Sequence, residues 1–109
     1  MSDKELLELA AKAANQPIEF TDGVPVAFIE DGVVFPPWNP LTDDGDALRV
    51  AALLEIDLEV DGHKVRALTG EFAAREESGS DRCAAIRRAI VRVAAEIGKA
   101  TPQPAEGDK

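Results

Sequence analysis

The stretch from Pro36 to Val50, PPWNPLTDDGDALRV, marks the point where an extended pattern in the chain changes to a helical one. Pro37 and Pro40 keep the residues before them out of helical geometry, so the chain up to Pro40 is expected to be an extended connection. Thr42 or Asp43 then caps the helix that follows, because an N-cap side chain accepts a hydrogen bond from an amide of the first turn. The stretch therefore predicts a loop that leads into a helix.

Asp43, Asp44 and Asp46 admit a structural and a functional interpretation. In the first turn of a helix, unpaired amides and the helix dipole favour negative charge, which accounts for all three carboxylates without a ligand. The EF-hand calcium pattern fails, since starting at Asn39 or at Asp44 places a leucine at a ligand position. The remaining alternatives are a magnesium site, in which Asp43 and Asp46 hold the ion together with a phosphate-bearing ligand, and a metal-dependent hydrolase that uses Asp43, Asp44 or Asp46. We expect the structural role.

Two Asp-Gly pairs downstream of Pro25 predict β-hairpins. Turning about Asp31-Gly32 sets Ile29 opposite Val34 and Phe28 opposite Phe35, so both faces are apolar, as in a sheet that is covered on both sides. Turning about Asp61-Gly62 separates an apolar face from a charged one, and this predicts a half-buried hairpin with one solvated, ion-paired face. The second hairpin's expected pairs are Val60 with His63, Glu59 with Lys64, Leu58 with Val65, Asp57 with Arg66, and Ile56 with Ala67.

Three helices and one short strand complete the expected elements. A Ser2–Glu5 capping box opens a helix over 2–14, the Asp-rich stretch opens one over 43–54, and Ser80 or Asp81 opens one over 81–97. Gly98 fits the position just past the last helix, and Cys83 fits its apolar, buried face. A short strand is expected at 18–20. We expect one globular domain over 1–98 and a disordered, Pro-rich tail over 99–109.

Composition narrows the classes of function. The chain has 109 residues, of which 45% are hydrophobic and 30% charged, and this indicates a single soluble domain. Its net charge of −9 opposes binding to nucleic acids or anionic membranes, and its single cysteine cannot form an internal disulfide. We therefore expect no nucleic-acid or membrane partner and a cytoplasmic location.

Candidate ligand-binding groups are few. The last helix carries a band of arginines: Arg82, Arg87, Arg88 and Arg92. Its simplest interpretation is a solvated, ion-paired face, and its functional interpretation is a patch that binds phosphate. Trp38 is expected to be a packing anchor and not a stacking platform. His63 and Cys83 are not expected to form a catalytic pair. Catalytic residues, metal ligands and cofactors are therefore expected to be absent.

The order of these motifs along the chain is similar to that in a known protein family. WNPLTDDGDALRVAALL, a charged strand pair and a final RRAIVRVAAEIG resemble the phage ABA sandwich domain family of small phage and prophage proteins. The resemblance implies an α+β fold, specifically a three-layer α/β/α sandwich with one mainly antiparallel sheet of about four to five strands and three helices. It implies a phage or prophage origin, in the cytoplasm of a bacterial host, and supplies no mechanism.

Three functions therefore stay open. We expect a non-enzymatic accessory protein, a monomer or homodimer, that acts by binding a host or phage protein. The second hypothesis is a small-molecule binder, for example of a nucleotide, that uses the arginine band or the Trp38 loop, and the third is the metal-dependent hydrolase. The candidate interaction or ligand surface comprises Trp38, Asn39, Asp43, Asp44, Asp46, Arg49, Arg87, Arg88 and Arg92.

Overall fold

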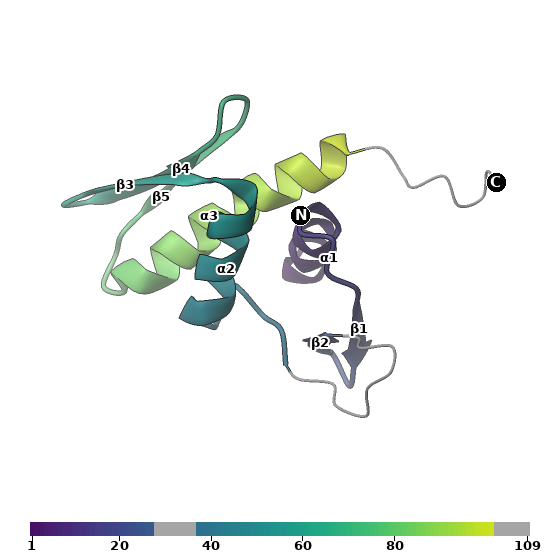
Figure 1. The fold of residues 1–109 in the computed structure, drawn as a ribbon. Helices are drawn as coiled ribbons and strands as arrows, with labels where there is room; N and C mark the ends of the chain where they lie inside the picture. Colours follow the sequence, from purple (N-terminus) through teal and green to yellow (C-terminus); the bar gives the residue numbers. More distant parts are fainter. Residues whose placement is uncertain (28–36, 102–109) are drawn as a thin grey trace.

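A computed structural model describes residues 1–27 and 37–101, which form an α+β structure of three helices and five strands (Figure 1). All three expected helices are present, with ends within three residues of the predicted ones. In chain order the elements are α1 (Asp3–Ala13), β1 (Ile18–Thr21), β2 (Val24–Ala27), α2 (Asp44–Leu54), β3 (Asp57–Asp61), β4 (Lys64–Leu68), β5 (Ala73–Glu77) and α3 (Arg82–Ala100).

The strands form two separate antiparallel sheets, so the prediction of one sheet with four to five strands is wrong. One sheet has the order β1-β2 and the other β3-β4-β5. Figure 1 shows the two sheets at opposite ends of the described structure, with the helices between them. The ammonium group of Lys4 in α1 lies over the ring of Phe20 in β1, whereas β4 and β5 pack on α3.

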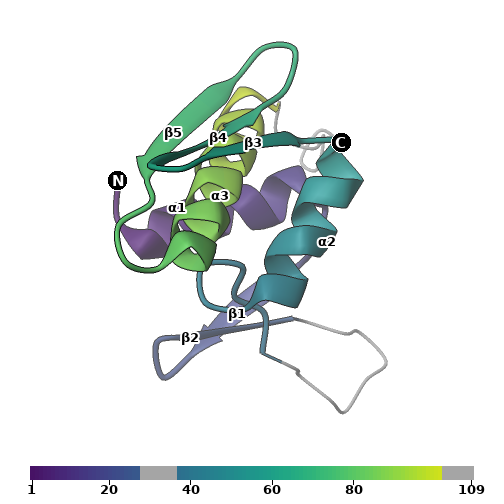
Figure 2. The same ribbon diagram turned by 90° about the vertical axis from the view of Figure 1, so that its left-hand side faces the viewer.

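Helix α3 is the central element. It contacts β4 and β5 on one side and α1 and α2 on the other, as the two perpendicular views show (Figures 1 and 2). The second half of α3 is therefore buried around most of its circumference, as this set of buried residues shows: Ala89, Ile90, Val91, Val93, Ala94, Ala95 and Gly98.

Gly98 lies inside α3, and the prediction that it follows the helix end is wrong. A Cβ atom built on Gly98 would lie 2.0 Å from the backbone carbonyl oxygen of Leu9 in α1. The absence of a side chain thus lets the two helices approach at backbone contact distance. Helix α3 continues to Ala100, so it extends into the predicted tail, and residues 102–109 lie outside the described part of the chain.

The hairpin β3–β4 has the predicted faces but a different register. Asp61 pairs with Lys64 and Glu59 with Arg66, so each residue of β3 pairs two positions further along β4 than predicted. Neither Asp61 nor Gly62 has a positive φ, so the expected type I′ turn about these two residues does not form. Instead Ser78 and Arg82 both donate hydrogen bonds to the Gly62 carbonyl oxygen, at 3.2 and 3.0 Å.

A shift of two residues leaves every side chain on its original face, since strand side chains alternate with a period of two. The charged, ion-paired face is confirmed by the Arg66–Glu59 pair, with 2.7 Å between nitrogen and oxygen. Strand β5 was not predicted, because its sequence AAREE favours a helix; pairing with β4 overrides that preference.

Asp22-Gly23 forms the turn of the β1–β2 hairpin, with φ of 53° and 79°. Thr21 pairs with Val24 across this turn, as a type I′ turn requires. The hairpin predicted about Asp31-Gly32 lies outside the described residues. The residues that flank it are described, and Val26 pairs antiparallel with Pro37. This is the pair expected when the predicted pairing of Phe28 with Phe35 is continued two residues outward.

Candidate functional site

The three aspartates at the start of α2 have three different partners. Asp43 is the N-cap, and its Oδ2 accepts a 2.8 Å hydrogen bond from the Asp46 amide. Asp44 forms a 2.6 Å ion pair with Arg87 of α3. The expected helix cap is therefore confirmed for Asp43, while Asp44 joins two helices.

Asp46 is a buried carboxylate that holds the preceding connection onto α2. Its Oδ2 accepts a 2.9 Å hydrogen bond from the Asn39 amide, and its Oδ1 pairs with Arg49 at 2.8 Å. The Asn39 side chain in turn accepts from the Leu41 amide at 2.9 Å. Asn39, Asp46 and Arg49 thus form a local network that fixes the loop between Trp38 and α2.

Trp38 is a packing residue, as expected. It is 9% exposed and belongs to the hydrophobic core. Its amide donates a 3.0 Å hydrogen bond to the Pro25 carbonyl oxygen of β2. A cavity of about 320 Å³ lies beside it, lined also by Arg49 and Leu53.

The arginines of α3 are paired with acidic groups or backbone carbonyls, which confirms the simpler interpretation of the band. Arg87 also donates to the Leu41 carbonyl oxygen, at 2.8 Å. Arg92 forms a 2.6 Å pair with Glu76 of β5, and Arg88 lies 3.3 Å from Asp3 and 3.9 Å from Glu76. These pairs connect α3 to the N-terminus of α1 and to β5.

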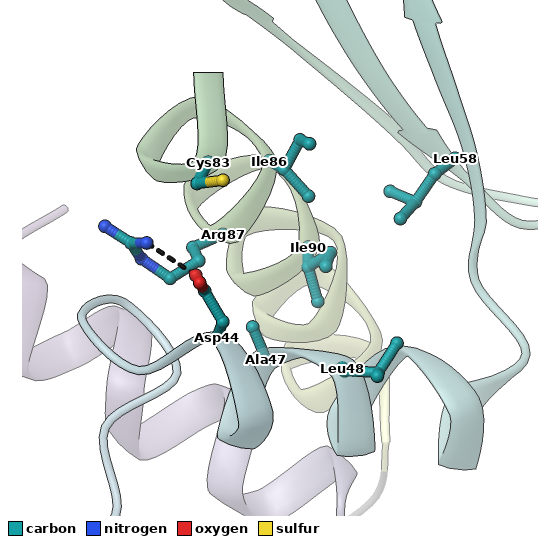
Figure 3. A pocket seen from close by; sticks show the side chains of 8 residues that line it. All are labelled: Asp44, Ala47, Leu48, Leu58, Cys83, Ile86, Arg87 and Ile90. Carbon is teal, nitrogen blue, oxygen red and sulfur yellow. Dashed lines mark hydrogen bonds and ion pairs between the residues drawn. The ribbon is translucent and has the colours of Figure 1, made fainter. Parts of the chain in front are cut away.

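Cys83 is exposed, so its predicted burial is wrong. It lies in the first turn of α3. There it lines an apolar groove of about 220 Å³ between α2, α3 and β3 (Figure 3). We call this the β3 groove, and it is lined by Asp44, Ala47, Leu48, Leu58, Cys83, Ile86, Arg87 and Ile90.

Apolar side chains around the β3 groove remain accessible. Leu48 is 65% exposed, Leu58 38%, and Val60, which follows Leu58 on the same face of β3, 48%. Figure 3 shows Leu58, Leu48 and Ile86 on three different elements around the groove, with the Asp44–Arg87 pair at one end. Exposed apolar residues that gather from several elements are typical of a protein-binding surface.

The groove residues were missed by the sequence analysis, apart from Asp44 and Arg87. Leu58 was assigned to the apolar face of a half-buried hairpin, and the pattern of residues alone does not show which part of such a face stays uncovered. Among residues 1–27 and 37–101, no group of three His, Cys, Asp or Glu side chains is placed to hold a metal ion. Within the same residues, no helix combines the length and apolar character needed to cross a bilayer.

Comparison of the chain with protein-family models, with curated proteins and with solved structures finds no match.

Proposed function

We propose that this protein is a small acidic binding module that acts by docking on another protein through the β3 groove and the adjoining face of β3. The observation that carries the proposal is the exposure of Leu48, Leu58 and Val60 around one apolar groove. Burying apolar surface contributes about 25 cal/mol per Å², so a partner that covers these side chains gains free energy from them.

Most of the candidate residues predicted from the sequence have structural roles in this proposal. Asp43, Asp46 and Arg49 hold α2 and its preceding loop, and Arg88 and Arg92 hold α3 to its neighbours. Only Asp44 and Arg87, at one end of the groove, are placed to contact a partner there. Their ion pair is a polar group at the margin of an apolar contact, the usual arrangement in protein interfaces.

The biological setting of the proposal comes from the sequence. The resemblance to the phage ABA sandwich domain family suggests a phage or prophage accessory protein, active in the bacterial cytoplasm on a host or phage partner. The same resemblance suggests a three-layer sandwich. In the described residues α3 covers one face of the β3-β4-β5 sheet, and a sandwich requires a further layer on its charged face.

The small-molecule alternative has less support, because the arginines that would bind phosphate are occupied by carboxylates or carbonyl oxygens. Thermal-shift measurements against nucleotides, with and without magnesium, test it. A ligand at 100 times its Kd would add about 2.7 kcal/mol to the free energy of unfolding. We expect no change in Tm.

The docking proposal is tested by affinity capture with three proteins: wild type, Leu48→Lys and Leu53→Lys. Leu48 and Leu53 both lie on α2 and are 65% and 62% exposed, but only Leu48 lines the β3 groove. Because both side chains are exposed, each substitution should change the free energy of unfolding by no more than about 0.5 kcal/mol.

We expect a bacterial protein that the wild type and Leu53→Lys retain and that Leu48→Lys loses, identified by mass spectrometry after capture at physiological salt. Loss from both variants, or retention by both, would contradict docking at the groove. Capture of nothing by the wild type would count against the function itself.

A further inference from the structure

Strand β3 is an edge strand. It pairs with β4, and within the part of the chain that the structure describes no strand pairs with its other side. All five of its residues are exposed. The free side of β3 therefore presents backbone N–H and C=O groups in position to pair with an added strand.

The inner face of β3 is apolar and overhangs the groove. Leu58 pairs with Ala67 and Val60 with Val65, so these four side chains lie on one face of the sheet. Ala67 and Val65 are completely buried by α3, whereas Leu58 and Val60 remain exposed because α3 lies beneath β4 and β5 (Figure 2). An added strand would extend this apolar face over the groove, beside Leu48.

The outer face of β3 is uniformly acidic, with Asp57, Glu59 and Asp61 at alternate positions. Among the described side chains Glu59 forms an ion pair, with Arg66. Asp57 is opposite Leu68, which offers no countercharge, while Asp61 is opposite Lys64. A strand added at this edge would meet three carboxylates on one face and apolar side chains on the other.

These charges disfavour a second copy of the chain as the occupant. Pairing two β3 strands about a twofold axis makes them antiparallel. Every such register that keeps Leu58 and Val60 on one face sets acid against acid on the other: Glu59 against itself, Asp57 against Glu59, or Glu59 against Asp61. Like charges directly opposite each other destabilise a strand pair.

We propose that β3 is a strand-addition site for a segment of a partner protein in which basic and apolar residues alternate. Its backbone would extend the sheet to four strands, its apolar side chains would cover Leu58, Val60 and the β3 groove, and its basic side chains would face the acidic residues of β3. This inference rests on the proposed docking function and specifies the chemistry of the partner.

The test uses the full chain and three synthetic peptides with blocked ends. The first alternates lysine and valine, the second has the same composition with its lysines grouped at one end, and the third replaces every lysine by glutamate. Binding is followed by amide chemical shifts of the isotope-labelled protein, which locate each peptide as well as measure its Kd.

We expect the alternating peptide to shift the amides of β3 and of the groove residues, with exchange protection appearing on β3. The grouped peptide should bind at least about tenfold more weakly, since it cannot place apolar and basic side chains on opposite faces. The glutamate peptide should not bind. Equal affinity for the alternating and grouped peptides, or shifts that map outside β3 and the groove, would overturn the proposal.

Two double variants with the same loss of negative charge separate local pairing from general attraction. Asp57→Asn with Asp61→Asn removes charges of β3, and Glu19→Gln with Asp22→Asn removes two exposed charges of the β1–β2 hairpin. Opposite-charge pairs across strands contribute about 0.2–1 kcal/mol each, so the loss of two of them in the β3 variant should weaken the alternating peptide by roughly twofold to thirtyfold. The β1–β2 variant should weaken it by less than twofold, and equal effects would overturn the assignment to β3.

The peptide experiment and the capture experiment can refute the strand-addition site and the docking function independently of each other. If peptides do not bind at β3 while a captured protein still depends on Leu48, docking stands and the strand-addition site is refuted. If the alternating peptide binds at β3 but the wild type captures no protein, the site stands and the proposed docking function is refuted.

Discussion

Glu55 ends α2 in a left-handed backbone conformation, with φ of 56° and ψ of 49°. The Ile56 amide donates to the Ala51 carbonyl oxygen at 2.9 Å and the Glu55 amide to that of Ala52 at 3.4 Å, the hydrogen bonds of a Schellman motif. This motif favours glycine at the left-handed residue, because the Cβ of any other L-residue crowds the following carbonyl. A glutamate is therefore retained there at a cost in stability.

Glu55→Gly should raise the free energy of unfolding by about 0.5–1 kcal/mol, because relief of the left-handed strain exceeds the added chain entropy of glycine. Urea denaturation, followed by the fluorescence of Trp38, measures the change. Asn15→Gly is the matched control, since Asn15 ends α1 with φ of 55° and asparagine tolerates this conformation. Its gain should be smaller, and an equal gain at both sites would contradict the strain at Glu55.

At the scale of single elements, the start of α2 shows why its three aspartates should not be interchangeable. Asp43→Ala should cost about 1 kcal/mol, the usual value of an N-cap side chain. Asp46→Ala should cost about 2–3 kcal/mol, because it leaves the part-buried Asn39 amide without its acceptor. Asp44→Ala should cost less than about 1 kcal/mol, since its ion pair with Arg87 has an exposed carboxylate.

Chemical denaturation of these three alanine variants measures the loss in free energy of unfolding for each one. If the three costs were equal, or if Asp44→Ala were the most damaging, the partners assigned to these carboxylates would be wrong. Added magnesium should leave all four proteins unchanged, including the wild type.

The capping box of α1 predicts a specific dependence on pH. Hydrogen bonds from the Ser2 amide and, secondarily, the Ser2 hydroxyl lower the pKa of Glu5 below its usual value of 4.5. A carboxyl with a depressed folded-state pKa stabilises the folded state above its unfolded pKa, and this contribution disappears as the pH falls through the folded value.

We therefore expect Glu5→Gln to lower the urea midpoint at pH 7 and to lose this effect as the pH falls below 4.5. Glu8→Gln, on an exposed position of the same helix, is the control for a change of charge alone. A difference between wild type and Glu5→Gln that stays constant down to pH 3 would contradict the assignment of the capping box.

The elements themselves could be predicted wherever local chemistry decides them. Capping residues located all three helices, and the alternation in β3 and β4 assigned each residue to the correct face. The register of that hairpin could not be predicted, because it depends on Ser78 and Arg82, whose hydrogen bonds to Gly62 come from residues beyond β5. Strand β5 was missed for a related reason, since its pairing with β4 outweighs the helical preference of its alanines.

For the whole molecule, the close contact of α1 and α3 at Gly98 organises the packing of the layers. Gly98→Ala should lower the free energy of unfolding by about 1–3 kcal/mol or more, because the new methyl group would meet the rigid backbone of Leu9. Without that contact, alanine would stabilise a helix interior by about 1 kcal/mol. The sign of the change, measured by thermal or urea denaturation, is therefore diagnostic.

Gly45→Ala in α2 is the comparison, since an added Cβ there meets the end of the Asp43 side chain at 3.2 Å and no distant backbone. We expect a change within about 1 kcal/mol. A stabilising Gly98→Ala would show that α1 and α3 are further apart than described.

The candidate site at this scale could be predicted only in part. The sequence identifies Asp44 and Arg87, but the groove between them and β3 depends on how far α3 extends beneath the sheet. Cys83, Leu48 and Leu58 all belong to apolar patterns, and only the packing of α3 against β4 and β5 shows which of them remain accessible. The edge position of β3 likewise follows from the arrangement of the strands and not from any single motif.

The central position of α3 also has a consequence for the folding of the chain during its synthesis on the ribosome. Every other described element precedes α3 in the sequence, and the ion pair between Arg88 and Asp3 spans 85 positions. The apolar residues of the earlier helices and strands that pack on α3 therefore remain exposed to solvent until α3 has left the ribosomal exit tunnel. Nascent chains of this protein should depend on chaperones, or on rapid synthesis, until that moment.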